Sequence, residues 1–130
     1  MKVNDNKHCF ACEDLNEYGL HADITTDDDN TSHCIISVPS RFQGWKGMVH
    51  GGIISTLLDE ISIYACRNIS LRGVTAEIDV KFRKPVPIDT ELELKAKVID
   101  IRRKMVSVQA ELLVGGEVHA TADTKVFNLE

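Results

Sequence analysis

Apolar residues recur at helical spacing between residues 52 and 68, and this periodicity predicts one long helix. The positions that repeat every three or four residues are Ile53, Ile54, Leu57, Leu58, Ile61, Tyr64 and Ala65. At 1.5 Å per residue such a helix is roughly 25 Å long, enough to cross a medium-sized β-sheet. The helix therefore covers one face of whatever sheet the rest of the chain forms.

Shorter apolar runs, several of them alternating with polar residues, predict six strands, two before the helix and four after it. The strand candidates are residues 19–24, 33–38, 76–83, 90–101, 104–114 and 117–127. An acidic segment, 25–32, is the predicted turn between the first two. Short turns join the last four strands, which predicts an antiparallel meander in an α+β fold of order β-β-α-β-β-β-β.

A sheet of this kind has an open edge strand and an uncovered face, and pairing two copies of the chain would cover both. The chain has 130 residues, of which 43% are hydrophobic, and this favours a single domain. Its net charge of −5 argues against a nucleic-acid partner. We see no signal peptide and no membrane span, so we expect a cytoplasmic protein without a membrane partner and with free thiols at its four cysteines.

The stretch GMVHGGIISTLLDE, residues 47–60, combines two features that bear on chemistry. The first N–H groups of a helix that begins near Gly51 lack intrahelical partners, and glycine at 51 and 52 lets a ligand approach them closely. The same glycines could instead serve only a tight turn into the helix. Two turns on, Asp59 and Glu60 stand in an apolar segment, where a carboxylate either reaches solvent or has a specific task.

The spacing His50-Gly51-Gly52 followed by Asp59 resembles the signature of hotdog-fold acyl-CoA thioesterases of the phenylacetic-acid-degradation (PaaI-like) type. The lead-in QGWKGMV (43–49), the segment GVTAEIDVKFRKP (73–85) and the early CFAC (9–12) with Gly19-Leu20 are also similar to segments of that family. The resemblance implies a curved antiparallel sheet wrapped around the helix in a single domain, 1–130, with a polar N-terminal arm, 1–18. It further implies a homodimer, or a dimer of dimers, with active sites shared between subunits.

The same resemblance implies four catalytic residues. Asp59 matches the carboxylate that acts as general base or as nucleophile, and Gly51 matches the residue whose backbone N–H polarises the thioester carbonyl. His50 matches the histidine that orients the loop or the thioester, and Thr75 matches a hydroxyl residue reaching in from the partner subunit. Neither a metal nor a cofactor is expected, because water, a base and one donor suffice to split a thioester; coenzyme A enters only as part of the substrate.

Residues for substrate binding are predicted around this motif. Gly52 and Trp45 belong to the loop, Gln43 neighbours the position where some members of the family carry Asn or Gln, and Glu60 is a supporting or interface group. Basic side chains suited to the phosphates of coenzyme A, although a solvated surface is the simpler interpretation, are Lys81, Arg83 and Lys84.

Alternatives to a hydrolase stay open at this level. A non-catalytic acyl-CoA binding or sensing module could use the same fold, and hotdog folds also host hydratases. The pair Cys9 and Cys12 could suggest zinc, but no second paired motif accompanies it, so we interpret both as ordinary thiols in a docked arm.

Overall fold

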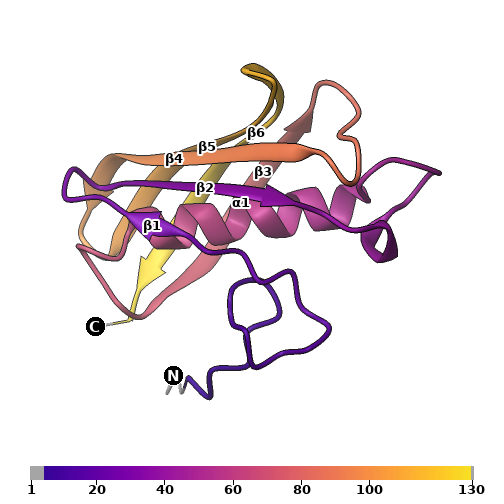
Figure 1. The fold of residues 1–130 in the computed structure, drawn as a ribbon. Coiled ribbons are helices and arrows are strands. Elements are labelled where there is room, and N and C mark those ends of the chain that lie inside the picture. Colours follow the sequence, from indigo (N-terminus) through magenta and orange to yellow (C-terminus); the bar gives the residue numbers. More distant parts are fainter. Residues whose placement is uncertain (1–4, 130) are drawn as a thin grey trace.

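The computed structural model describes residues 5–129, in which one helix lies along a six-stranded antiparallel sheet (Figure 1). The first four residues of the predicted arm and Glu130 lie outside the described residues. The elements are β1 (Thr25–Thr26), β2 (Thr31–Ser37), η1 (Ser40–Phe42), α1 (Gly51–Ala65), β3 (Gly73–Phe82), β4 (Glu91–Arg102), β5 (Met105–Val114) and β6 (Glu117–Asn128). The predicted order and the hotdog fold class are both confirmed.

The strands follow the order β1-β2-β4-β5-β6-β3 across the sheet. Strands β4, β5 and β6 do form a meander, but β3 pairs with β6 and not with β4, so the predicted four-strand meander is wrong. The connection between β3 and β4 contains two prolines and is too irregular for a hairpin, and β2 takes the place beside β4. Strand β3 consequently forms one edge of the sheet.

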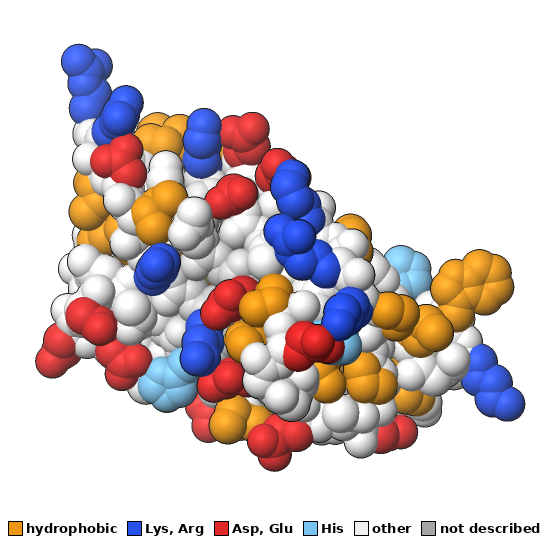
Figure 2. All heavy atoms as spheres, turned by 90° about the horizontal axis from the view of Figure 1, so that it is seen from above, with side chains coloured by type: hydrophobic (Ala, Val, Ile, Leu, Met, Phe, Trp, Pro, Cys, Tyr) orange, Lys and Arg blue, Asp and Glu red, His pale blue; other side chains and the backbone are white. Residues whose placement is uncertain are grey.

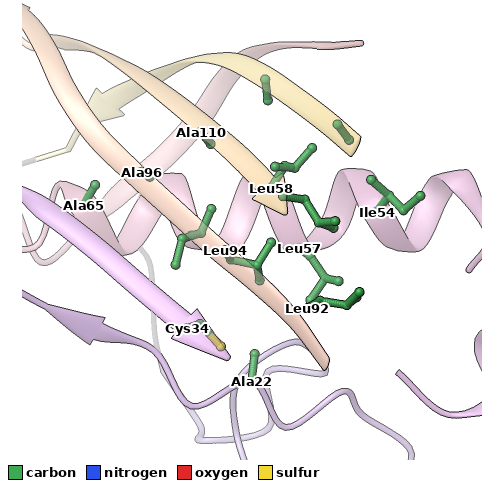
Figure 3. Close-up of a cluster of buried hydrophobic side chains, with 14 of the residues drawn as sticks. Ala22, Cys34, Ile54, Leu57, Leu58, Ala65, Leu92, Leu94, Ala96 and Ala110 are labelled. Carbon is green, nitrogen blue, oxygen red and sulfur yellow. The ribbon is translucent and has the colours of Figure 1, made fainter. Parts of the chain in front are cut away.

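The core lies between α1 and the inner face of the sheet (Figure 3). Leu57 and Leu58 of the helix are fully buried and point toward the sheet, where Leu92 and Leu94 of β4 meet them. Ser32 also joins the two layers, because its hydroxyl donates to the Ile61 carbonyl at 2.6 Å. This packing fixes the orientation of the helix, and with it the directions in which Asp59 and Glu60 project.

The predictions of the first strand and of the end of the helix were wrong. Residues 19–24 are not a strand, and only Thr25 and Thr26 pair with β2. The chain at 20–22 bonds instead to the N-terminal arm, since the N–H groups of Leu20 and Ala22 donate to the carbonyls of Phe10 and Ala11. The helix ends at Ala65 and not at residue 68, and the chain continues in turns.

Strand β3 departs from simple alternation because its register with β6 shifts between Thr75 and Glu77. Strict alternation would place Ala76 and Phe82 on the same face as Ile78 and Val80, yet Ala76 and Phe82 are exposed while Ile78 and Val80 pack partly against the core. A bulge of this kind near the start of an edge strand changes the direction of the neighbouring side chains. Here it leaves Thr75 turned toward the helix.

The outer face of the sheet carries charged side chains of both signs around a hollow of about 780 Å³ (Figure 2). Most of its lining comes from β2, β4, β5 and β6, on the side of the sheet away from the helix, and Asp27 and Arg83 complete it. Within residues 5–129, no helix is long and apolar enough to cross a bilayer.

Candidate active site

The helix α1 begins with a cap made by His50. The Nδ1 atom of His50 accepts a hydrogen bond from the Gly52 N–H at 2.9 Å, and His50 itself has extended backbone angles. A ring nitrogen that accepts cannot carry a proton, so the neutral ring holds its hydrogen on Nε2. His50 therefore orients the loop, and Gly52, predicted as a substrate-binding residue, has its N–H occupied by the cap.

Gly51 is left with a free donor at the start of the helix. Among residues 5–129 we find no acceptor for its N–H. A Cβ atom placed on Gly51 would lie 3.6 Å from the ring of Phe82, so the ring covers one side of this residue. The N–H adds to the positive end of the helix dipole and can hold a negatively charged oxygen.

The loop before the helix is held by its own hydrogen bonds. The Gln43 side chain accepts from the Gly47 N–H at 3.0 Å, where Gly47 has a positive φ of 79°. The Val49 N–H donates to Val86 at 2.8 Å and the His50 N–H to Phe42 at 3.0 Å. Gln43 thus stabilises the loop in this structure, and its contact with substrate stays a prediction.

Asp59 and Thr75 meet within one chain. The Thr75 hydroxyl donates to Oδ1 of Asp59 in a short hydrogen bond, which links α1 to the edge strand β3. Thr75 and Asp59 therefore belong to the same half of the site, which motif spacing alone did not reveal, and whether they meet Gly51 of a partner subunit stays a prediction. Oδ2 of Asp59 has no donor among the described residues, so one carboxylate oxygen is held and the other is free.

The neighbouring hydroxyls on the helix do not share this role. Ser55 donates to the Gly51 carbonyl at 3.0 Å and Thr56 to the Gly52 carbonyl at 2.9 Å, each one turn back along the helix. Thr75 is therefore the hydroxyl that positions Asp59.

We expect Thr75→Val to lower the catalytic rate of this site about tenfold, because the isosteric side chain removes one hydrogen bond to a charged oxygen. Thr75→Ser keeps the hydroxyl and should retain most of the activity. The measurement is kcat of the three proteins in the thioester hydrolysis that the sequence resemblance implies, with a thermal melt to check folding. Equal rates for the Val variant and the wild type would remove Thr75 from the site.

A second hollow, of about 670 Å³, opens beside the start of the helix. His50 and Gly51 border it together with Trp45, Arg83 and Lys84, so five of the predicted site residues converge there. Phe82 and Met48 also line this hollow. Sequence reasoning missed both, since alternation in β3 grouped Phe82 with the apolar side of the strand and gave it no part in a site.

Two predicted binding residues, Lys81 and Glu60, lie elsewhere. Lys81 pairs with Asp79 at 3.5 Å and does not border the hollow. Lys84, which does border it, forms an ion pair with Glu117 at 2.8 Å, and both side chains are about half exposed. Glu60 faces the N-terminal arm, where the two thiols of Cys9 and Cys12 lie near its carboxylate.

Burial raises the pKa of Glu60, and the nearby charge of Asp59 raises it further. A folded-state pKa above the unfolded value means that the folded chain binds this proton more tightly. Below about pH 4.5, the ordinary pKa of a glutamate, Glu60 therefore makes its full contribution to folding stability. This contribution is lost as the pH rises through the higher pKa of the folded state.

Glu60→Gln should therefore gain thermal stability relative to the wild type as the pH rises above that window, since glutamine cannot ionise. The measurement is the melting temperature of both proteins from acidic to neutral pH, in buffer with EDTA so that no metal ion binds the carboxylate. Glu91→Gln, at an exposed position, is the control. Parallel curves for the wild type and Glu60→Gln would contradict the stated burial effect.

Comparison with known proteins identifies the family. The family model described as "Thioesterase superfamily" matches residues 46–120, more than half of the chain, including the His50-Gly51-Gly52 loop, Asp59 and Thr75. The chain belongs to the thioesterase superfamily. Among curated proteins, this thioesterase-superfamily chain is 38% identical over 86 residues to MIOREX complex component 3 of Saccharomyces cerevisiae, which covers 64% of the chain and 32% of that protein. It spans a third or less of the length of the curated relatives it matches.

Solved structures of low identity share the fold. The PaaI protein of E. coli, from the phenylacetic acid degradation operon, superimposes with a TM-score of 0.80 at 20% identity, covering 90% of this chain and 86% of that one. A hypothetical thioesterase of Streptococcus pneumoniae TIGR4, solved with coenzyme A, gives a TM-score of 0.75 at 22% identity over 82% and 84% of the two chains. The predicted resemblance to PaaI-like hotdog proteins is confirmed.

Proposed function

We propose that this chain hydrolyses acyl-CoA thioesters to a free carboxylic acid and coenzyme A. The observation that carries the proposal is the Asp59 carboxylate, with one oxygen held by Thr75 and the other free. The free N–H of Gly51 supplies the second requirement of the reaction, a donor for the carbonyl oxygen. Membership of the thioesterase superfamily supports the same chemistry.

The two groups are too far apart in one chain to act on one carbonyl. Gly51 and Asp59 are eight residues apart on α1, which corresponds to about 12 Å along the axis. The attacking atom and the reacting carbonyl must approach to about 3–3.5 Å. We therefore propose that each site combines Asp59 and Thr75 of one subunit with the Gly51 N–H and His50 of another.

The open edge of β3 offers a way to bring these halves together. Thr75, which binds Asp59, lies near one end of β3, and Phe82, which covers Gly51, lies at the other. An antiparallel pair of β3 strands centred between Ile78 and Asp79 would set Thr75 of one copy opposite Phe82 of the next. The dimer would then contain two complete sites, one on each side of the two-fold axis.

The hollow beside Gly51 suits the pantetheine and phosphate parts of the substrate. Trp45 and Phe82 supply apolar surface and are 85% and 56% exposed. Arg83 and Lys84 supply positive charge at the same hollow, and phosphate favours such side chains. A structural neighbour solved with coenzyme A supports this ligand class.

The reaction can be written with these groups alone. Oδ2 of Asp59 takes a proton from water, the water oxygen bonds to the carbonyl carbon, and the carbonyl oxygen gains charge against the Gly51 N–H of the partner subunit. The C–S bond then breaks, the carboxylic acid forms, and the sulfur leaves as the thiol of coenzyme A with the proton returned by Asp59. In the nucleophilic variant, Oδ2 itself bonds to the carbonyl carbon, the C–S bond breaks and the sulfur of coenzyme A leaves as thiolate. Water then hydrolyses the resulting anhydride, which releases the acid, restores the Asp59 carboxylate and supplies the proton that the thiolate takes up.

The test is the release of free thiol from a panel of acyl-CoA esters that spans short, medium and aryl acyl groups. Turnover with at least one ester, above that of a heat-treated sample, is the expected result. A non-catalytic binding module is the alternative function, and it would show saturable binding of acyl-CoA without thiol release. Binding without thiol release across the whole panel would refute hydrolysis and would favour the binding module.

A further inference from the structure

The N-terminal arm brings two thiols onto the helix beside the candidate site. One sulfur each from Cys9 and Cys12 and a carboxylate oxygen of Glu60 all lie within 4.8 Å of one another. Cys9 and Cys12 come from a turn closed by the Glu13 N–H donating to the Cys9 carbonyl at 3.1 Å. Glu60 comes from α1 and is distant in sequence, which is why the cysteine pair alone did not indicate a third ligand.

The arm that carries the thiols is packed against the rest of the chain and hydrogen-bonded to it. Ala11, between the two cysteines, is almost fully buried, and Phe10 and Ala11 accept hydrogen bonds from Leu20 and Ala22. A side chain on Gly19 would collide with the Phe10 carbonyl oxygen, so glycine there permits the close approach of the two segments. The turn therefore presents both sulfurs toward Glu60 in a fixed arrangement.

The surroundings of Glu60 favour a cation. Asp59 and Glu13 both add negative charge near its carboxylate, and Arg67 is the positive side chain that acts on it. Arg67 also stacks on the ring of Tyr64, with 4.1 Å from Cζ to the ring centre. The Tyr64 hydroxyl in turn interacts with the Cys12 thiol. A half-buried carboxylate that lies near two other carboxylates is stabilised by a bound cation more than by solvent.

We propose that Cys9, Cys12 and Glu60 form a binding site for a zinc-type divalent cation. Two thiolates and one carboxylate are ligands that zinc accepts, and water can take the fourth tetrahedral position. Ligand atoms around tetrahedral zinc are about 3.6–3.8 Å apart, so the side chains need to close by only about 1 Å. Binding displaces the thiol protons to solvent, and the ion joins the arm to α1 one residue from Asp59.

A disulfide between Cys9 and Cys12 is the competing use of the same sulfurs. Such a bond would leave the Glu60 carboxylate with Arg67 as its positive neighbour, whereas a cation uses all three groups. The site is independent of thioester hydrolysis, because neither its ligands nor its test involve turnover.

The test is a titration of the full chain with Co²⁺, and then Zn²⁺, after treatment with EDTA and in buffer with a phosphine reductant. We expect one equivalent of Co²⁺ per chain with thiolate-to-cobalt charge-transfer absorption, and displacement of cobalt by Zn²⁺. Cys12→Ser should abolish this absorption, and Glu60→Gln should weaken the affinity at least tenfold. His8→Ala, which removes an exposed histidine next to Cys9, is the matched control and should bind as the wild type.

Three outcomes would overturn the site: no charge-transfer absorption, unchanged binding by Cys12→Ser, or a mass two hydrogens lower that shows a Cys9–Cys12 disulfide in the reduced sample. If Cys12→Ser fails to fold, the site is tested instead by the melting temperatures of the other proteins with and without Zn²⁺. Zn²⁺ should then raise the melting temperature of the wild type and of His8→Ala by the same amount, and that of Glu60→Gln by clearly less. An equal rise in all three proteins would also refute the site.

Discussion

Replacing Asp59 by asparagine should lower kcat for thioester hydrolysis by about 10³-fold, within the range that a positioned base contributes. Asparagine has the same shape, and its carbonyl oxygen can still accept from Thr75, so the contact between α1 and β3 should persist. What is lost is the basicity of the free oxygen. The measurement is kcat with the best ester of the panel, together with a thermal melt and the oligomeric state.

Asp123→Asn is the matched control for this change, because Asp123 is exposed on β6 and borders the hollow on the outer face of the sheet. It should keep the wild-type rate. Wild-type turnover by Asp59→Asn would mean that another group activates the water, and the assignment of the base would have to be abandoned.

The second large effect is expected from Gly51→Pro, which removes the proposed oxyanion donor without changing a side-chain charge. Proline is tolerated at the first position of a helix, and the extended angles of His50, φ −60° and ψ 137°, suit a residue before proline. The added Cβ atom would meet the Phe82 ring only at ordinary contact distance. Loss of one such donor should lower kcat about 10²- to 10³-fold.

Gly51→Ala is the matched comparison, because it adds a methyl group at the same place and keeps the N–H. We expect its kcat to stay within about tenfold of the wild type. If the proline and alanine variants lose the same activity, crowding explains the loss, and the N–H is not the donor. Both variants should also retain the cap between His50 and Gly52, which a thermal melt would verify.

Sequence patterns predicted the parts of the fold that depend on local periodicity. The repeat of Leu57 and Ile61 defines the helix, and alternation defines β4, β5 and β6 within one or two residues. The position of β3 could not be predicted in this way. Alternation shows that a segment is a strand, but the pairing of β3 with β6 is set by packing of the whole sheet.

The site residues that lie on one helix could be predicted from the sequence. Contacts between segments that are distant in the sequence could not. His50, Gly51 and Asp59 lie on or next to α1, and their spacing along it follows from helix geometry. Motif spacing did not reveal that Thr75 contacts Asp59 of its own chain, since that contact depends on the bulge in β3. The approach of Cys9 and Cys12 to Glu60 depends on docking of the arm, which leaves no periodic signal.

The most direct test of the shared site is a heterodimer that carries Asp59→Asn in one subunit and Gly51→Pro in the other, isolated through two different affinity tags. One of its two sites then combines an intact Asp59 with an intact Gly51 of the partner subunit. We predict that each homodimer is nearly inactive and that the heterodimer regains about half of the wild-type activity per dimer. A heterodimer as inactive as its parents, or a wild-type chain that is monomeric when active, would contradict a site built from two subunits.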